Sequence, residues 1–213
     1  MAEEPVTVPR GRHAPPLEVR REVQLQRLFQ AAAKVFSEVG YADASAEAIS
    51  READMSKATF YEHFANKEEC ILALTDAAGA ASRAAVAQAA TTAEEQFEAR
   101  VHARVHRFLQ GLEMFPEMAR VVLVDVIGVG PAGDARRDEM LQAFADFLVT
   151  ENEAAHRSYG APLFSSPDDA FAIVGAIVEL ASRQLRTGQP ERMSELEPVI
   201  ERLVAGILEQ SAP

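Results

Sequence analysis

Residues 40–74 read GYADASAEAISREADMSKATFYEHFANKEECILAL. Ser45 and Ser56 are good N-cap residues, because a serine oxygen can accept a hydrogen bond from an unpaired amide at the start of a helix. Each serine is followed by two apolar residues at helical spacing, Ile49 and Ala53 and then Phe60 and Phe64. The stretch therefore predicts two short helices joined by a tight turn at Asp54 and Met55.

Helical patterns flank this pair on both sides. Before it, one face of a predicted helix carries apolar residues up to Gly40, which is well placed to end that helix: Leu25, Leu28, Phe29, Ala32, Ala33, Phe36 and Val39. After it, Asn66 and Glu69 have capping-box spacing and predict a long helix to about residue 90. Three helices within residues 20–64 are compatible with a helix-turn-helix unit.

The stretch resembles the DNA-binding region of the TetR family of transcriptional repressors. That family's motif runs Gly-aromatic, a Thr or Ser opening the second helix, Ile-Ala, Ala-Gly-Val-Ser and Thr-x-Tyr-x-His-Phe-x-x-Lys. The matching residues are Gly40, Tyr41, Ser45, Ile49, Ala53, Met55, Ser56, Thr59, Tyr61, His63, Phe64 and Lys67. The resemblance covers residues 20–74, and beyond residue 75 only the all-helical plan and the length agree.

Three positions depart from the family pattern. Asp54 stands where the family usually has Gly between the two short helices, and Asp tolerates a left-handed backbone better than most residues. Ser50 replaces the common Ala and Cys70 the common Leu. We expect the turn to survive these changes.

A helix that enters the major groove must present short polar groups to the bases and keep its apolar side chains behind it. The segment from Ser56 to His63 has this pattern. By similarity to the family, the expected DNA-binding residues are Ser45, Lys57, Ala58, Thr59, Tyr61, His63 and Lys67, with Lys57, Ala58 and Thr59 nearest the bases. The alternative is that the polar ones among them are ordinary surface residues.

The distribution of charge separates the chain into two parts. The 213 residues carry a net charge of -12, which argues against broad, nonspecific attraction to nucleic acid. Residues 10–70 hold 9 bases and 10 acids, whereas residues 71–213 hold 12 bases and 21 acids. The densest basic cluster could follow a DNA backbone or could belong to a soluble tail, and it comprises Arg10, Arg12, Arg20 and Arg21.

Composition also bears on the compartment. The single cysteine, Cys70, cannot form an internal disulfide, and the first twenty residues hold no apolar stretch typical of a signal peptide. No run of eighteen uncharged apolar residues occurs. We therefore expect a cytoplasmic protein without a membrane span, and we expect no cofactor.

The remaining sequence is also divided into helical segments. Capping residues, Pro and Gly predict helices at about 92–112, 116–128, 134–159, 166–188 and from about 194 to the end. A strand at 121–127 is the alternative for the β-branched run, but no partner strand is apparent. The fold class is therefore all-α with about nine helices, arranged as a flexible arm (1–17), a helix-turn-helix domain (18–66) and a helical ligand-binding and dimerisation domain (67–213).

The resemblance implies a ligand cavity in the second domain. The expected lining comprises Phe97, Val101, Phe108, Met118, Val122, Asp125, Phe144, Phe147, Phe171 and Glu179. Taken singly, each apolar member also fits an ordinary core position. The two carboxylates could meet a cationic ligand, pair with Arg183 or lie exposed.

The last two predicted helices are the candidates for a homodimer interface, because each has a broad apolar face. These faces comprise Phe171, Val174, Ile177, Val178 and Ala181, with Ala170 and Gly175 allowing close approach, and Val199, Ile200, Leu203, Val204 and Ile207. His102 and His106 share a helix face and could bind zinc, but the sequence supplies no third ligand nearby. We therefore expect no metal site.

Together these features favour a TetR-like transcriptional regulator, most simply a repressor that a small, largely apolar molecule releases from a palindromic double-stranded operator. A helical adaptor that binds only protein is the alternative, and the net acidity favours it. A helical-bundle enzyme is a weaker one, because the sequence has no Glu-x-x-His pair, phosphate-binding loop or nucleophile elbow.

Overall fold

The computed structural model describes residues 16–92 and 97–210, which form helices joined by short connections and contain no strand. The order of elements is α1 (Leu17–Asp43), α2 (Ala46–Glu52), α3 (Lys57–His63), α4 (Lys67–Thr92), α5 (Phe97–Met114), α6 (Pro116–Leu123), the 3-10 helix η1 (Asp125–Val129), α7 (Pro131–Tyr159), α8 (Pro167–Thr187), the 3-10 helix η2 (Met193–Leu196) and α9 (Glu197–Gln210). The all-α prediction with nine α-helices is confirmed for these residues.

The predicted helix starts are confirmed where a side chain caps them. The Ser45 and Ser56 hydroxyl oxygens accept from the amides of Ala48 and Thr59, at 3.1 and 3.0 Å. Asn66 Oδ1 accepts from the Glu69 amide at 2.9 Å. Gly160 and Gly188 end α7 and α8 in a left-handed conformation, whereas Gly40, expected to end the first helix, forms a kink inside α1 with φ +77°.

Two predicted boundaries and one predicted side-chain orientation were wrong. The helix expected to reach Gly128 ends at Leu123 and is followed by η1. The helix α7 begins at Pro131 rather than after Asp134, because proline fits the first helical position and Gly130 supplies φ +92° before it. Val39, expected inward, is half exposed. Residues 1–15 of the predicted arm and residues 93–96, near the start of the helix predicted at about 92–112, lie outside the described residues.

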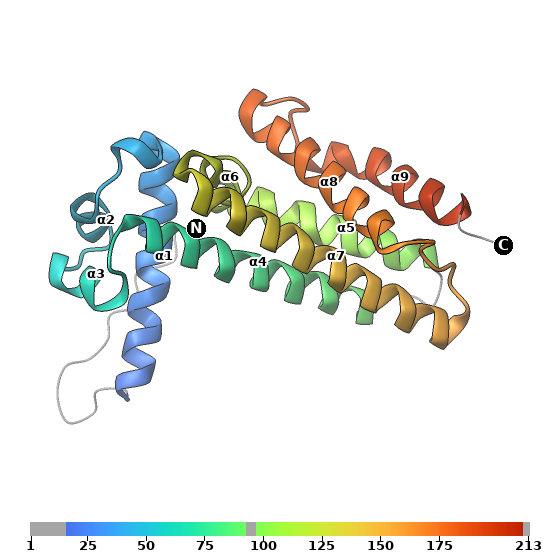
Figure 1. Ribbon diagram of the computed structural model, residues 1–213, viewed down its shortest axis with the longest axis horizontal. Coiled ribbons are helices and arrows are strands. Elements are labelled where there is room, and N and C mark those ends of the chain that lie inside the picture. Colours follow the sequence, from blue (N-terminus) through green and yellow to red (C-terminus); the bar gives the residue numbers. More distant parts are fainter. Residues whose placement is uncertain (1–15, 93–96, 211–213) are drawn as a thin grey trace.

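The helices form an elongated molecule (Figure 1). The short helices α2 and α3 lie at one end beside α1, and α4, α5 and α7 run side by side through the other part. The pair α8 and α9 covers one side of that part. Helix α1 packs on α2 and also on α4, α6 and η1, so it belongs to both parts of the molecule.

One described helix, α4, is long and apolar enough over Lys67–Ala89 to cross a membrane, with a mean hydropathy of 1.3 in its most apolar stretch. Core helices of soluble bundles have the same property. Because α4 packs against α1, α5, α6 and α7, we attribute its composition to the bundle.

The single thiol lies in the first turns of α4. Cys70 is fully buried among the apolar side chains that join α4 to α1. Burial raises the pKa of this thiol to about 12. The reactive thiolate is therefore scarcely populated at neutral pH.

The close approach of α7 to η1 depends on Gly133. A Cβ atom at this position would overlap the Val126 carbonyl oxygen and lie 2.9 Å from Val129 Cβ. Gly133→Ala must push the two elements apart, so we expect it to lower the free energy of unfolding by about 3 kcal/mol, measured by urea denaturation. The matched control is Gly111→Ala in α5, where the new Cβ meets nothing within 4 Å, and it should raise stability by up to ~1 kcal/mol. Equal effects of the two changes would contradict this account.

Candidate nucleic-acid interface and central cavity

The turn between α2 and α3 is held from both sides. Asp54 adopts the left-handed backbone expected of it, with φ +53°. On one side the Met55 amide donates to the Ser50 carbonyl at 2.9 Å. On the other side Arg27 Nη2, from α1, donates to the Ala53 carbonyl at 2.6 Å. Sequence reasoning missed Arg27, because its partner lies 26 residues away.

Aromatic packing sets the orientation of α3. The Phe60 ring is fully buried, and the Phe64 ring lies 5.4 Å from it and 5.8 Å from Phe29 of α1, measured between ring centroids. This packing turns the opposite face of α3 outward. Lys57, Ala58 and Tyr61 are exposed there, as the major-groove pattern requires.

The other predicted contact residues lie around this face. Ser45 is exposed at the start of α2, and its hydroxyl proton remains able to donate after its oxygen caps the helix. The Thr59 hydroxyl lies 2.9 Å from that of Ser56. His63 is half-buried at the end of α3. Burial is the main cause that lowers the pKa of its imidazole, and the positive charge of Arg21 lowers it further. Arg21 of α1 is therefore close enough to His63 to act on it electrostatically.

The Lys67 side chain makes contacts within the protein instead of facing outward as a DNA contact. Its ammonium group donates to the carbonyls of Tyr41, Ala42 and Ala44, at 2.7, 2.9 and 2.9 Å, and lies over the Tyr41 ring. All three of its protons are therefore used within the protein. Lys67 joins the first turn of α4 to the segment between α1 and α2, and we remove it from the expected DNA contacts.

The three lysines of the chain have unequal roles. Lys34 Nζ pairs with Glu52 at 2.6 Å, and Lys67 is bonded as described above. Lys57 is exposed at the first position of α3, and its side chain has no hydrogen bond or ion pair with the residues that the structure describes. It is therefore the lysine whose charge is available to an external partner.

The second feature is an apolar cavity of about 620 Å³ within the bundle. Helix α4 contributes Ala77, Ala78, Ala81 and Ala85 to its wall. Because these side chains end at Cβ, α4 leaves space where larger residues would fill the core. The alanine-rich stretch was a readable signal for the cavity that the sequence prediction did not use.

Six of the ten predicted lining residues do line this cavity, namely Phe97, Val101, Phe108, Met118, Val122 and Phe144. The other four predictions were wrong. Phe171 is 40% exposed on α8, and Phe147 lies outside the lining. Asp125 of η1 lies 3.7 Å from Arg120, and burial raises the pKa of its carboxyl group. Glu179 pairs on the surface with Arg186 at 2.9 Å rather than with Arg183.

The charged residues of the cavity wall do not suit the cationic ligand that the sequence allowed. Among the described lining residues, Arg104 and Arg107 are charged and none is acidic. Arg104 is ion-paired to Glu151, and its buried Nε–H has no acceptor among the residues that the structure describes. The charge that the described side chains bring to the cavity wall is therefore positive.

The predicted interface residues divide between core and surface. Val174, Val178, Ala181 and Ile200 are buried inside the subunit, so they cannot form a free interface. Phe171 of α8 and Val199 of α9 are instead exposed, at 40% and 38%.

The three hydrogen bonds of Lys67 predict a stability effect. Lys67→Met leaves three carbonyls without their charged donor, and we expect the free energy of unfolding to fall by about 2 kcal/mol. Lys57→Met is the matched control, because that side chain is exposed and unpartnered, and it should change stability by less than about 0.5 kcal/mol. Chemical denaturation of both variants measures the difference, and a Lys67 variant as stable as the control would refute the role given to this lysine.

Comparison with known proteins agrees with this geometry. Residues 28–74 match the family model described as bacterial regulatory proteins, tetR family. No curated protein matches the sequence.

Three similar solved structures cover most of the chain. The fatty acid degradation regulator FadR from Bacillus halodurans is 17% identical, with a TM-score of 0.69 over 85% of this chain and 94% of that one. The regulator FadR from Bacillus subtilis, in complex with stearoyl-CoA, is 16% identical, with a TM-score of 0.71 over 85% and 98%. A regulatory protein in the tetR family from Rhodococcus RHA1 is 19% identical, with a TM-score of 0.64 over 85% and 96%. The chain therefore has the DNA-binding domain of the tetR family of bacterial regulatory proteins, on the fold that TetR-family transcriptional regulators share.

Proposed function

We propose that this transcriptional regulator is a dimeric repressor that a small apolar molecule with an anionic group releases from its operator. The observation that carries the proposal is the position of Phe29 in α1. This ring packs against Phe64 at the end of α3, the expected recognition helix, and it also lines the cavity. The protein then acts by binding alone, without catalysis.

The outward face of α3 would enter the major groove. Lys57, Ala58 and Thr59 occupy the first turn of α3, where side chains reach base edges, and the Ala58 methyl group can meet a thymine methyl group. Ser45, Tyr61 and His63 would donate to phosphates, and Arg21 joins them because it approaches His63. The helix-turn-helix domain then ends near residue 66, where α4 begins.

We infer a homodimer through α8 and α9. One helix-turn-helix unit reads too few base pairs for useful discrimination, so two copies must bind a palindromic site together. The exposed Phe171 and Val199 supply apolar surface, and a Cβ at Gly175 or Gly206 would meet nothing within 4 Å of its own subunit. Both helices can therefore accept a close partner.

The lining of the cavity limits the effector. Its volume of about 620 Å³ is in the range of small-molecule sites, and its apolar walls favour an apolar body. The positive charge of Arg104 and Arg107 in the wall, with no acidic residue among the described lining residues, favours a carboxylate or another anionic group. Stearoyl-CoA, bound by the Bacillus subtilis regulator of similar fold, has these two properties.

Release from DNA would follow from linkage between the two sites. An effector that binds better when α3 is displaced lowers operator affinity by the reciprocal factor. The shortest route runs from the cavity through Phe29 to Phe64 and then Phe60 of α3. Helix α4 offers a second route, because Lys67 fixes its start to the DNA-binding domain and its later alanines line the cavity. We place the protein in the cytoplasm, where operator and effector meet.

Loss of the Lys57 charge should weaken DNA binding, whereas loss of the Lys34 charge should not. We expect Lys57→Met to weaken binding to the DNA upstream of the protein's own gene about tenfold or more, because each subunit loses one charged contact, and to reduce the salt slope by about 1 for each lost contact. Mobility shift over a range of salt concentrations measures both. Lys34→Met is the control, since Lys34 is already paired with Glu52. No retardation of the unmodified protein at low salt would favour a protein-binding adaptor instead.

Filling the cavity should prevent release without affecting DNA binding. Gly111 lines the cavity with open space at its Cβ position, so Gly111→Phe places a ring where the effector would lie. Long-chain fatty acids and their CoA thioesters are the probes, and calorimetry should give at least tenfold weaker binding to this variant than to Gly111→Ala. A Gly111→Phe protein that binds both probes normally, or a fatty amine that binds better than the acid, would contradict the proposed effector site.

A further inference from the structure

Two imidazole side chains of α5 face two carboxylate side chains of α9. His102 and His106 lie one turn apart on α5, and their rings stack with centroids 6.0 Å apart. Glu197 and Glu201 lie one turn apart on α9. His102 Nδ1 is 2.6 Å from Glu201 Oε1, and His106 Nδ1 is 2.9 Å from Glu197 Oε1.

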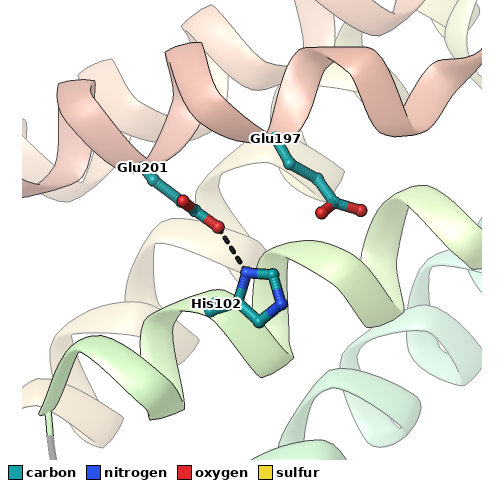
Figure 2. Close-up of side chains that lie close together, drawn as sticks. All are labelled: His102, Glu197 and Glu201. Atoms are coloured by element: carbon teal, nitrogen blue, oxygen red, sulfur yellow. Dashed lines mark hydrogen bonds and ion pairs between the residues drawn. The ribbon is translucent and has the colours of Figure 1, made fainter.

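The geometry is that of a convergent set of metal ligands. One ligand atom from each of His102, Glu197 and Glu201 lies within 4.8 Å of the other two. Figure 2 shows the imidazole of α5 directed between the two carboxylates of α9. Imidazole nitrogen and carboxylate oxygen bind zinc at about 2.0 to 2.2 Å, so side-chain rotations suffice to bring the three atoms around one ion. Two of these three ligands, Glu197 and Glu201, come from α9, which is far from His102 in the sequence.

Two ordinary surface ion pairs are the alternative explanation. Each alone would contribute little, because exposed pairs are screened by water and lose side-chain entropy. The position of Glu197 between the two histidines argues against two independent ion pairs. This carboxylate bonds His106, lies near the ligand atoms of His102 and Glu201, and has a side chain only 16% exposed. A carboxylate held by a second imidazole is the arrangement that orients a metal ligand.

We propose that His102, Glu197 and Glu201 bind one divalent transition-metal ion, zinc in the first instance, and that His106 is a positioning residue for Glu197. Three protein ligands leave further coordination positions to water. Mg²⁺ and Ca²⁺ are poor competitors, because both prefer a shell made only of oxygen.

A metal ion bound between α5 and α9 would affect the cavity, because both helices also line it. Val101 and Val105, beside the two histidines on α5, line the cavity, as do Ile200 and Val204 beside the two glutamates on α9. A metal ion that joins these helices therefore fixes one wall of the cavity. Zinc should raise the thermal midpoint of unfolding, because it binds the folded arrangement.

Calorimetric titration of the tag-free, EDTA-treated full-length protein with ZnCl₂ tests the proposal. We expect one Zn²⁺ per chain with the unmodified protein, unaffected by millimolar Mg²⁺. His102→Asn and Glu201→Gln should lose this binding, and His106→Asn should weaken it by about 10- to 100-fold. His156→Asn is the matched control, because that imidazole interacts with the Ala161 carbonyl near the end of α7, and it should bind zinc normally.

Two results would overturn the proposal. One is an unmodified protein that takes up no zinc at concentrations of tens of micromolar. The other is zinc binding that His102→Asn and Glu201→Gln leave unchanged, which would place the ion elsewhere. Circular dichroism and metal-free thermal unfolding check that the variants fold, and none of these measurements depends on DNA or effector binding.

Discussion

The ammonium group of Lys67 ties the two functional parts of this protein together. The chain must turn sharply between α1 and α2, and the turn leaves the carbonyls of Tyr41, Ala42 and Ala44 directed toward one point. A single charged donor with three protons satisfies all of them. Since this donor is the first residue of α4, the helix that lines the cavity starts from a fixed place on the DNA-binding domain.

Local signals in the sequence were enough to predict the helix-turn-helix domain. Ser45, Ser56 and Asn66 cap helices through contacts within three residues, and Asp54 takes its left-handed backbone for a local steric reason. Sequence spacing contains this information directly. The predicted contact surface on α3 follows, because burying Phe60 leaves only one face exposed.

Roles that depend on distant partners could not be predicted in this way. Lys67 has the same sequence motif whether its ammonium meets phosphate or backbone, and only the fold brings the carbonyls near it. The pairing of Glu179 with Arg186, and the exposure of Phe171, depend on which face of α8 is covered by α6, α7 and α9. The division into domains at residue 66 has the same weakness, because α1 packs on elements of both parts.

The buried thiol of Cys70 has a practical consequence for measuring motion in this protein. Because its thiolate is suppressed and no other cysteine exists, maleimide and methanethiosulfonate reagents have no competing target on the native surface. A cysteine introduced on the exposed face of α3 would accept a spin label selectively. Electron paramagnetic resonance could then follow the separation of the two recognition helices in solution, with the original cysteine left in place.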